Sequence, residues 1–248
     1  MFLTTRALVL REVKYKEADK ILTVLTEREG KLTVKARGAL RKSSKIAAAT
    51  QQLCYAEMTL FGNRGKWTVN EASLIEPFSG LRGDIQAFAL GSYISECLEA
   101  FSMEEEPDAE LLQLGLNSLY ALSRGLADMR LIKAAFEIRL MSIAGYRPDV
   151  NACSECGTTE PEQPVLILDS GMLRCRDCRK SAAAEWEKLD DGSLMALRHI
   201  INAPAKKILS FSLAGNSLDL LSTAAERYLL RHAERGFASL SYWKNLRD

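Results

Sequence analysis

Residues 21–36 read Ile21-Leu22-Thr23-Val24-Leu25-Thr26-Glu27-Arg28-Glu29-Gly30-Lys31-Leu32-Thr33-Val34-Lys35-Ala36. The first six residues are apolar or β-branched, as in a strand, and the pair Glu29-Gly30 is typical of a turn. In the run that follows, basic or hydroxyl side chains alternate with apolar ones, so one face of this strand is expected to be wet and charged. The stretch therefore predicts two strands joined by a turn.

Three further strands are predicted on either side of this pair. Residues 3–10 form a β-rich run before it, and residues 54–61 and 67–75 form a second pair, joined by the turn 62–65. Five short strands within about 75 residues predict a small barrel or sandwich, and a five-stranded OB-fold fits that size and count. The basic segment 38–45, between the third and fourth strands, is predicted to be a loop.

The rest of the chain has mostly helical periodicity. The expected fold class is α+β, with an OB-fold nucleic-acid-binding domain over residues 1–80 and a helical domain over residues 81–248. A cysteine module at residues 150–180 is embedded in the helical domain. The predicted helices cover residues 84–101, 111–126, 131–143, 182–201 and 218–235.

Composition places the chain among globular proteins. Of its 248 residues, 47% are hydrophobic and 26% are charged, which argues against wholesale disorder. No apolar run reaches the roughly 18 residues needed to span a bilayer, so no membrane partner is expected. The first residues lack a basic segment followed by an apolar one, and a cytoplasmic location is therefore expected.

Charge is distributed unevenly along the chain. Residues 1–80 hold 14 basic and 8 acidic residues, whereas the remainder holds 19 basic and 24 acidic residues. Two parts with net charges of opposite sign indicate two domains with different partners. A basic first domain suits a polyanionic partner.

Four of the six cysteines fall in two Cys-x-x-Cys pairs. Cys153 and Cys156 form the first pair, Cys175 and Cys178 form the second, and 18 residues separate them. This spacing lies within the range expected of a zinc site, and Gly157 permits a tight turn after the first pair. One structural Zn²⁺ is therefore expected, since four thiolates leave no open position for water. Free thiols or a redox dithiol are the alternatives, and the isolated Cys54 and Cys97 are predicted core residues.

Motifs of enzymatic chemistry are missing from the sequence. There is no phosphate-binding loop, no Gly-x-Ser-x-Gly and no His-Glu-x-x-His. The two histidines, His199 and His232, lie in helical patterns and are predicted to be structural. No catalytic residue is therefore assigned, and the chain is not expected to be an enzyme.

The basic strand and loop have two interpretations. Cations alternate with small residues at positions 35, 37, 41, 42 and 45, which suits either a solubilising face or phosphate contacts along a barrel groove. Trp67 and Tyr55 are either stacking surfaces for bases or buried barrel residues. The residues alone do not choose between these alternatives.

Four stretches resemble the RecO family of bacterial DNA-repair and recombination mediators. They are residues 5–22, residues 30–39 with the basic loop, residues 136–149 from Phe136 to Asp149, and the Cys-x-x-Cys-Gly turn that follows. The resemblance runs in order along nearly the whole chain, and the block from Phe136 to Gly157 is its most specific part.

This resemblance implies a non-enzymatic, nucleoid-associated protein that binds single- and double-stranded DNA and anneals complementary strands. It also implies cooperation with RecR and single-stranded-DNA-binding protein, and through them the loading of RecA. The residues expected to contact DNA are Arg6, Lys14, Lys35, Arg37, Arg41, Lys42, Lys45 and Lys66.

Resemblance and composition together suggest that the helical domain binds the acidic, apolar-ended tail of single-stranded-DNA-binding protein. Such a tail needs an apolar pocket with cations at its rim. The candidate cations are Arg130, Lys133, Arg139, Arg227 and Arg231. In the opposing interpretation the apolar stripes are core and the cations are merely solvated. An RNA-binding or translation-associated OB-fold and zinc-ribbon module, or a purely structural adaptor, are the alternative functions.

Overall fold

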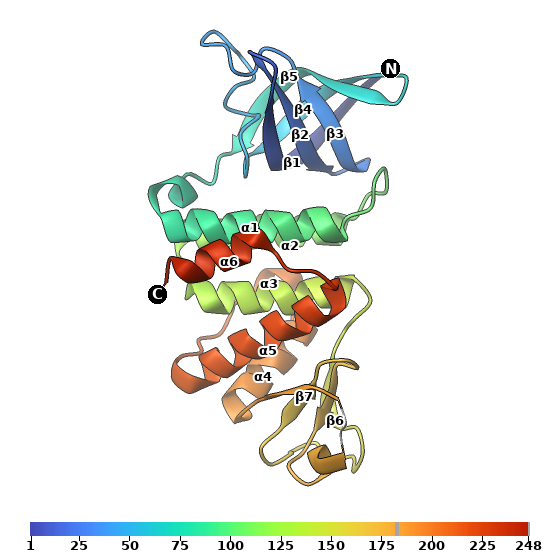
Figure 1. Cartoon of the computed structure of the whole chain (residues 1–248), viewed down its shortest axis with the longest axis vertical. Coiled ribbons are helices and arrows are strands. Elements are labelled where there is room, and N and C mark those ends of the chain that lie inside the picture. Colours follow the sequence, from blue (N-terminus) through green and yellow to red (C-terminus); the bar gives the residue numbers. More distant parts are fainter. Residues whose placement is uncertain (182–183, 248) are drawn as a thin grey trace. The chain divides into compact units, whose positions relative to one another are not determined.

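The computed structural model describes residues 1–181 and 184–247, which divide into two compact units (Figure 1). Unit 1 comprises Met1–Arg124 together with Phe237–Asp248, and unit 2 comprises Gly125–Gly236. This division by contacts falls at residues 124 and 236, whereas secondary structure changes from strands to helices near residue 80.

The first 76 residues form a closed five-stranded barrel. Its strands are β1 (Phe2–Tyr15), β2 (Asp19–Thr26), β3 (Gly30–Ala36), β4 (Tyr55–Asn63) and β5 (Lys66–Glu76). Neighbours pair antiparallel in the order β1-β2-β3-β5-β4, and β4 returns to β1. The exception is β3 with β5, which run parallel and place Val34 beside Trp67. Five predicted strands are thereby confirmed, and the closed barrel has the strand number expected of an OB-fold.

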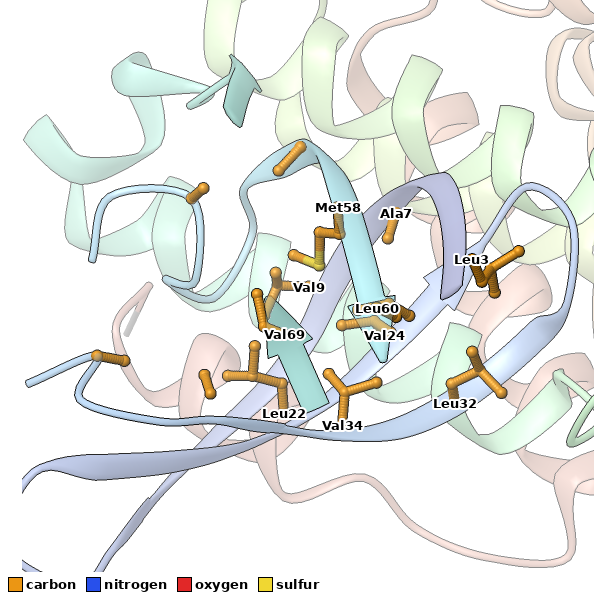
Figure 2. Close-up of a cluster of buried hydrophobic side chains, with 14 residues drawn as sticks. Leu3, Ala7, Val9, Leu22, Val24, Leu32, Val34, Met58, Leu60 and Val69 are labelled. Atoms are coloured by element: carbon orange, nitrogen blue, oxygen red, sulfur yellow. The ribbon is translucent and has the colours of Figure 1, made fainter. Parts of the chain in front are cut away.

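Alternate side chains of these strands fill the barrel, as the two-residue period of a strand requires. Figure 2 shows side chains from all five strands converging on this core. Burying a valine or leucine side chain contributes about 1.5–3 kcal/mol, so this cluster is a principal source of barrel stability. The labelled members are Leu3, Ala7, Val9, Leu22, Val24, Leu32, Val34, Met58, Leu60 and Val69.

Unit 1 also contains three α-helices and a short 3₁₀ helix. They are η1 (Ser79–Gly83), α1 (Ile85–Phe101), α2 (Ala109–Arg124) and α6 (Ala238–Asn245). The Asp84 carboxylate accepts hydrogen bonds from the backbone N–H groups of Gln86 and Ala87 at 2.8 and 3.2 Å, which fixes the start of α1. Asp108 accepts from the N–H of Leu111 at 2.8 Å and starts α2 in the same way. Helix α6 was not predicted.

Unit 2 combines three helices with a small four-stranded sheet. The helices are α3 (Met129–Ile143), α4 (Asp191–Asn202) and α5 (Gly215–Ala233), with the 3₁₀ turns η2 (Cys178–Ser181) and η3 (Ala205–Lys207). The strands are β6 (Asp149–Cys153), β7 (Val165–Ile167), β8 (Met172–Arg174) and β9 (Trp186–Lys188), in the order β6-β8-β7-β9. β7 and β8 form the hairpin between the two cysteine pairs.

One predicted helix starts too early. Residues 182–201 were expected to be helical, but Trp186–Lys188 is a strand paired with β7, and α4 begins at Asp191. Asp190 and Ser193 form a capping box in which each side chain accepts a hydrogen bond from the other residue's backbone N–H, and this fixes the start of α4. The expectation for residues 182 and 183 lies outside the described residues.

Within the described ranges, no helix combines the length and apolar character that crossing a bilayer requires.

Candidate nucleic-acid interface and metal centre

The four cysteines of the two pairs come together in unit 2. Cys153 ends β6, Cys156 follows in a turn, and Cys175 and Cys178 lie directly after β8. Their sulfur atoms all lie within 4.8 Å of one another, and the Sγ atoms of Cys156 and Cys175 are 3.8 Å apart. Metal–sulfur bonds of about 2.3 Å in a tetrahedron require sulfur separations of roughly 3.8 Å. The cluster therefore fits a metal ion.

Each pair is built on the same backbone turn. The N–H of Gly157 donates to Cys153 O at 2.9 Å, and the N–H of Arg179 donates to Cys175 O at 3.0 Å. Gly157 has a φ of 76°, so the conformational freedom predicted for this glycine is used. Burial of Cys153 opposes its ionisation, but backbone N–H groups of Cys156, Glu155 and Cys175 lower the pKa of its thiol to about 6.

A second candidate site lies where the basic segment meets the turn between β1 and β2. The N–H groups of Gly38 and Leu40 donate to the Asp19 carboxylate and to Ala18 O at 2.9 and 3.0 Å. Lys35 forms an ion pair with the same carboxylate at 2.9 Å. The Gly38 N–H and the Lys35 side chain lower the pKa of Asp19, so this carboxylate stays ionised and ties the segment to the turn.

The structure brings several of the predicted DNA contacts to this end of the barrel. Lys14 is exposed near the end of β1, Lys35 is half-buried on β3, and Arg37, Arg41, Lys42 and Lys45 are exposed along the segment. Two others lie on neighbouring parts of the barrel. Arg6 is opposite Glu57 on the β1–β4 wall, and Lys66 begins β5, two residues before Thr68, which pairs with Lys35. The group Lys14, Lys35, Arg37, Arg41 and Lys42 is called the basic rim below.

Tyr15 and Lys16 also belong to this end, although the sequence did not single them out as contacts. The exposed Tyr15 ring has the Nζ atoms of Lys35 and Lys16 at 5.0 and 5.6 Å from its centroid. Their position at a hairpin turn next to a basic strand could have identified them from the sequence as candidate DNA contacts. Trp67 and Tyr55, the proposed stacking residues, are half-buried, and Trp67 packs against the barrel core.

The opposite end of β2 and β3 is acidic. Glu27 and Glu29 lie in the turn between these strands, and the segment 104–106 bridges to Gly30 and Lys31. The N–H of Glu105 donates to Lys31 O at 3.3 Å, which holds three consecutive glutamates at this end. The barrel is thus electrically polarised, and a polyanion is attracted to the basic rim.

The five cations predicted to bind a partner are all engaged within unit 2. Lys133 is fully buried and pairs with Glu137 and Glu226 at 2.9 and 3.0 Å. Arg139 donates to the carbonyls of Ile200 and Ile201, near the end of α4. The other three are ion-paired, Arg130 with Asp128 and Asp219, Arg227 with Glu185 and Glu187, and Arg231 with Asp169.

Arg227 and Arg231 line a hollow of about 670 Å³ in unit 2. Its wall includes the His232 ring, which lies against Tyr146 and Tyr228 with centroids 4.4 and 4.5 Å away. Burial lowers the pKa of His232, which favours the neutral ring. Two of the five predicted cations therefore lie at the rim of a partly apolar hollow, whose remaining lining residues are Leu168, Asp169, Glu185, Leu230 and Glu234.

A five-stranded closed barrel with a basic rim, followed by helices and a four-cysteine cluster, defines an OB-fold protein of the nucleic-acid-binding class. The family model for the N-terminal part of recombination protein O matches residues 1–78, and the model for its C-terminal part matches residues 82–241. The chain belongs to the RecO family of DNA repair proteins.

Curated relatives agree with this assignment. DNA repair protein RecO of Acetivibrio thermocellus is 34% identical over 246 residues, which cover 99% of this chain and 97% of that protein. DNA repair protein RecO of Symbiobacterium thermophilum is 29% identical over 248 residues, covering 97% of this chain and 96% of that protein. A third, from Desulforamulus reducens, is 34% identical over 173 residues, 69% of this chain and 67% of the relative.

Proposed function

We propose that the chain is a recombination mediator that binds single- and double-stranded DNA through its barrel and anneals complementary strands. In this role it acts with RecR and single-stranded-DNA-binding protein to help load RecA, without catalysing a reaction itself. The observation that carries the DNA-binding part is the basic rim, where the segment 37–42 is tied by hydrogen bonds to the β1–β2 turn. Since its proposed substrate is chromosomal DNA, the protein is proposed to act in the cytoplasm, at the nucleoid.

The DNA contacts proposed are Arg6, Lys14, Lys35, Arg37, Arg41, Lys42, Lys45 and Lys66. Exposed lysines and arginines attract the phosphates of DNA of any sequence. This favours annealing, because the protein binds both strands through their phosphates and leaves the bases free to pair. Among these residues, Lys35 is a weaker phosphate contact, because its ammonium already forms an ion pair with Asp19. That ion pair holds β3 to the β1–β2 turn at the basic rim.

The four-cysteine cluster is proposed to hold one structural Zn²⁺. Zinc would neutralise the thiolates of Cys153, Cys156, Cys175 and Cys178 and fix β6 and β8 at one point. Four thiolates at this spacing suit Zn²⁺ better than Mg²⁺ or Ca²⁺, which prefer oxygen ligands.

For the tail of single-stranded-DNA-binding protein, we propose the hollow lined by Arg227 and Arg231 as the docking site. Its apolar wall suits a terminal aromatic residue, and its arginines suit neighbouring carboxylates if the tail displaces Asp169 and Glu185. Lys133 supports the unit from within, because its ion pair with Glu137 is fully buried, and the half-buried Arg139 supports it by donating to the end of α4.

Strand annealing tests the proposed function. Complementary oligonucleotides coated with single-stranded-DNA-binding protein should anneal faster with this protein, and Arg41→Ala with Lys42→Ala should reduce that acceleration. The matched control is Arg28→Ala, which removes an exposed arginine between Glu27 and Glu29 in the β2–β3 turn of the same barrel. Equal loss in both variants, or no acceleration by the unmodified chain, would contradict the proposal.

A further inference from the structure

Two exposed aromatic rings lie side by side on the outer wall of the barrel, and the β5 residue Thr68 pairs both with Phe61 and with Lys35 of the basic rim. Phe2 of β1 and Phe61 of β4 are cross-strand partners with ring centroids 5.2 Å apart. Their exposed fractions are 64% and 40%, although large apolar rings gain free energy when they leave water. Adjacent exposed rings indicate a surface that another molecule covers.

Cations lie in the turn directly after Phe61. Arg64 is exposed in the β4–β5 turn and Lys66 is exposed at the start of β5, and no carboxylate of the described residues forms an ion pair with either. The rings are therefore bordered by two cations that have no internal partner to neutralise them. A ligand that matches this border carries negative charge together with flat apolar faces.

A close contact between Gly62 and Trp67 lies next to the rings. Gly62 pairs with Trp67, and a Cβ atom at Gly62 would come within 2.8 Å of the indole ring, so only glycine lets the ring lie across this strand. Trp67 in turn packs against the barrel core. The strand that carries Phe61 is thereby packed against Trp67 before any ligand arrives, which reduces the ordering cost of binding.

Acidic residues limit the direction in which a bound strand can run. The sheet position next to the pair is the Thr4–Thr59 hydroxyl contact at 3.2 Å, and Glu71 lies beside Thr59 on β5. Phosphates on that side would meet a carboxylate, whereas phosphates on the other side meet Arg64 and Lys66. The charge pattern therefore favours a polyanion that extends from the rings over the turn.

We infer that the Phe2–Phe61 pair is a base-stacking platform for single-stranded DNA, with the adjoining phosphates on Arg64 and Lys66. The inference rests on the proposed DNA-binding function, and it names the residues that make the protein bind single strands in preference to duplex DNA. Bases of a single strand expose their flat faces, whereas those of a duplex are already stacked inside it. Stacking tolerates any sequence, as annealing of arbitrary strands requires.

The test compares three fluorescent ligands of equal length: an oligo(dT), an abasic strand with the same phosphates, and a duplex. Phe61→Leu keeps the apolar contact with Phe2 but removes the ring, and it should raise the Kd for oligo(dT) by about 5- to 150-fold. Its Kd for the abasic strand and for the duplex should stay unchanged. Phe61→Tyr, which keeps a ring, should retain oligo(dT) binding.

Two further variants complete the design. Arg64→Ala with Lys66→Ala should weaken oligo(dT) and abasic binding alike, and Ile75→Ala, an exposed apolar residue of β5, should change neither. The melting temperature of each variant checks that the barrel stays folded.

Three outcomes would overturn the inference or its basis. If Phe61→Leu leaves oligo(dT) binding intact, or weakens oligo(dT) and abasic binding equally, the pair is not a stacking platform. If it leaves DNA binding intact but abolishes binding of RecR, the pair is a protein contact. If the unmodified chain binds none of the three ligands, the proposed DNA-binding function itself fails.

Discussion

At the scale of single residues, the interior of unit 2 holds an unusual charge group. The ammonium of Lys133 lies between the carboxylates of Glu137 and Glu226, and the exposed fractions of the three side chains are 0%, 0% and 16%. Each buried charge has lost its hydration, and the group persists because opposite charges lie within hydrogen-bond distance. Removal of the cation would leave two carboxylates facing each other.

Lys133→Met should therefore lower the free energy of unfolding by about 3–5 kcal/mol, measured by urea denaturation. Arg130→Met is the matched control, since the ion pairs of Arg130 lie at the surface and contribute about 0–1 kcal/mol. The double variant Lys133→Met with Glu137→Leu should recover part of the loss. A single variant as stable as the unmodified chain would show that the ion group contributes nothing net.

Cys175→Ser should remove most of the bound zinc and lower the melting temperature of unit 2, because metal binding and folding of this module are coupled. Metal analysis of protein purified under reducing conditions should give one zinc per unmodified chain. Cys97→Ala, in the core of unit 1, is the control and should keep the zinc. Less than one zinc per unmodified chain would refute the site.

The clustering of the four cysteines could be predicted from the sequence and the ion pairs of the cations could not, for a physical reason. Each Cys-x-x-Cys pair is a local turn whose geometry depends on four consecutive residues, so spacing alone carries the information. The burial of Lys133 depends on Glu226, which lies on another helix and becomes a neighbour only when α3 packs against α5. The same holds for Arg227, whose partners Glu185 and Glu187 come from the region of β9.

At the scale of elements, helix boundaries depend on their capping residues. Burial of Asp190 opposes its ionisation, but the Ser193 N–H and the Ser217 hydroxyl outweigh this and lower the pKa of Asp190 below its ordinary value of 3.8. Since the folded state prefers the ionised form, the cap stabilises α4 above pH 3.8, and this contribution is lost as the pH falls through the depressed pKa.

Asp190→Ala should accordingly lower the free energy of unfolding by about 1 kcal/mol at pH 7, measured by chemical denaturation. The difference between the variant and the unmodified chain should shrink as the pH falls below 3.8. Asp191→Ala is the control, because Asp191 lies in the first turn of the same helix without the capping bonds of Asp190. A difference that persists undiminished at acid pH would contradict the charged cap.

Elements with long periodic patterns were predicted better than short ones. The barrel strands and helices α1 to α3 show clear apolar periods, and their predicted ranges agree with the structure within a few residues. β9 has three residues and is a strand because β7 offers it a partner, so the helical interpretation was wrong for residues 184–190. Helix α6 is also short, with eight residues, and its buried side is the side that packs against α1. Its own sequence therefore gave too short a pattern to predict it.

At the scale of the whole molecule, charge is the property that the sequence conveyed directly. The first 80 residues carry the basic excess, and the exposed cations Lys14, Arg37, Arg41 and Lys42 lie at the basic rim. The logarithm of the association constant for single strands should fall with the logarithm of salt concentration at about 0.7 per phosphate neutralised. Arg41→Ala with Lys42→Ala should flatten that slope, whereas Arg28→Ala should not. A salt-independent affinity would exclude the rim as the DNA contact.

Unit 1 is completed by the segment after residue 236, since α6 packs against α1. The Phe237 ring meets Tyr93 edge-on at 5.6 Å, Ser239 donates to Glu96, and Gln86 donates to Leu246 O at 2.9 Å. On the ribosome, the residues of unit 2 therefore emerge while α1 still lacks its cover. A message with a stop codon before residue 237 would yield a chain in which the face of α1 that α6 covers is exposed to water, and such chains are removed by chaperones and proteases.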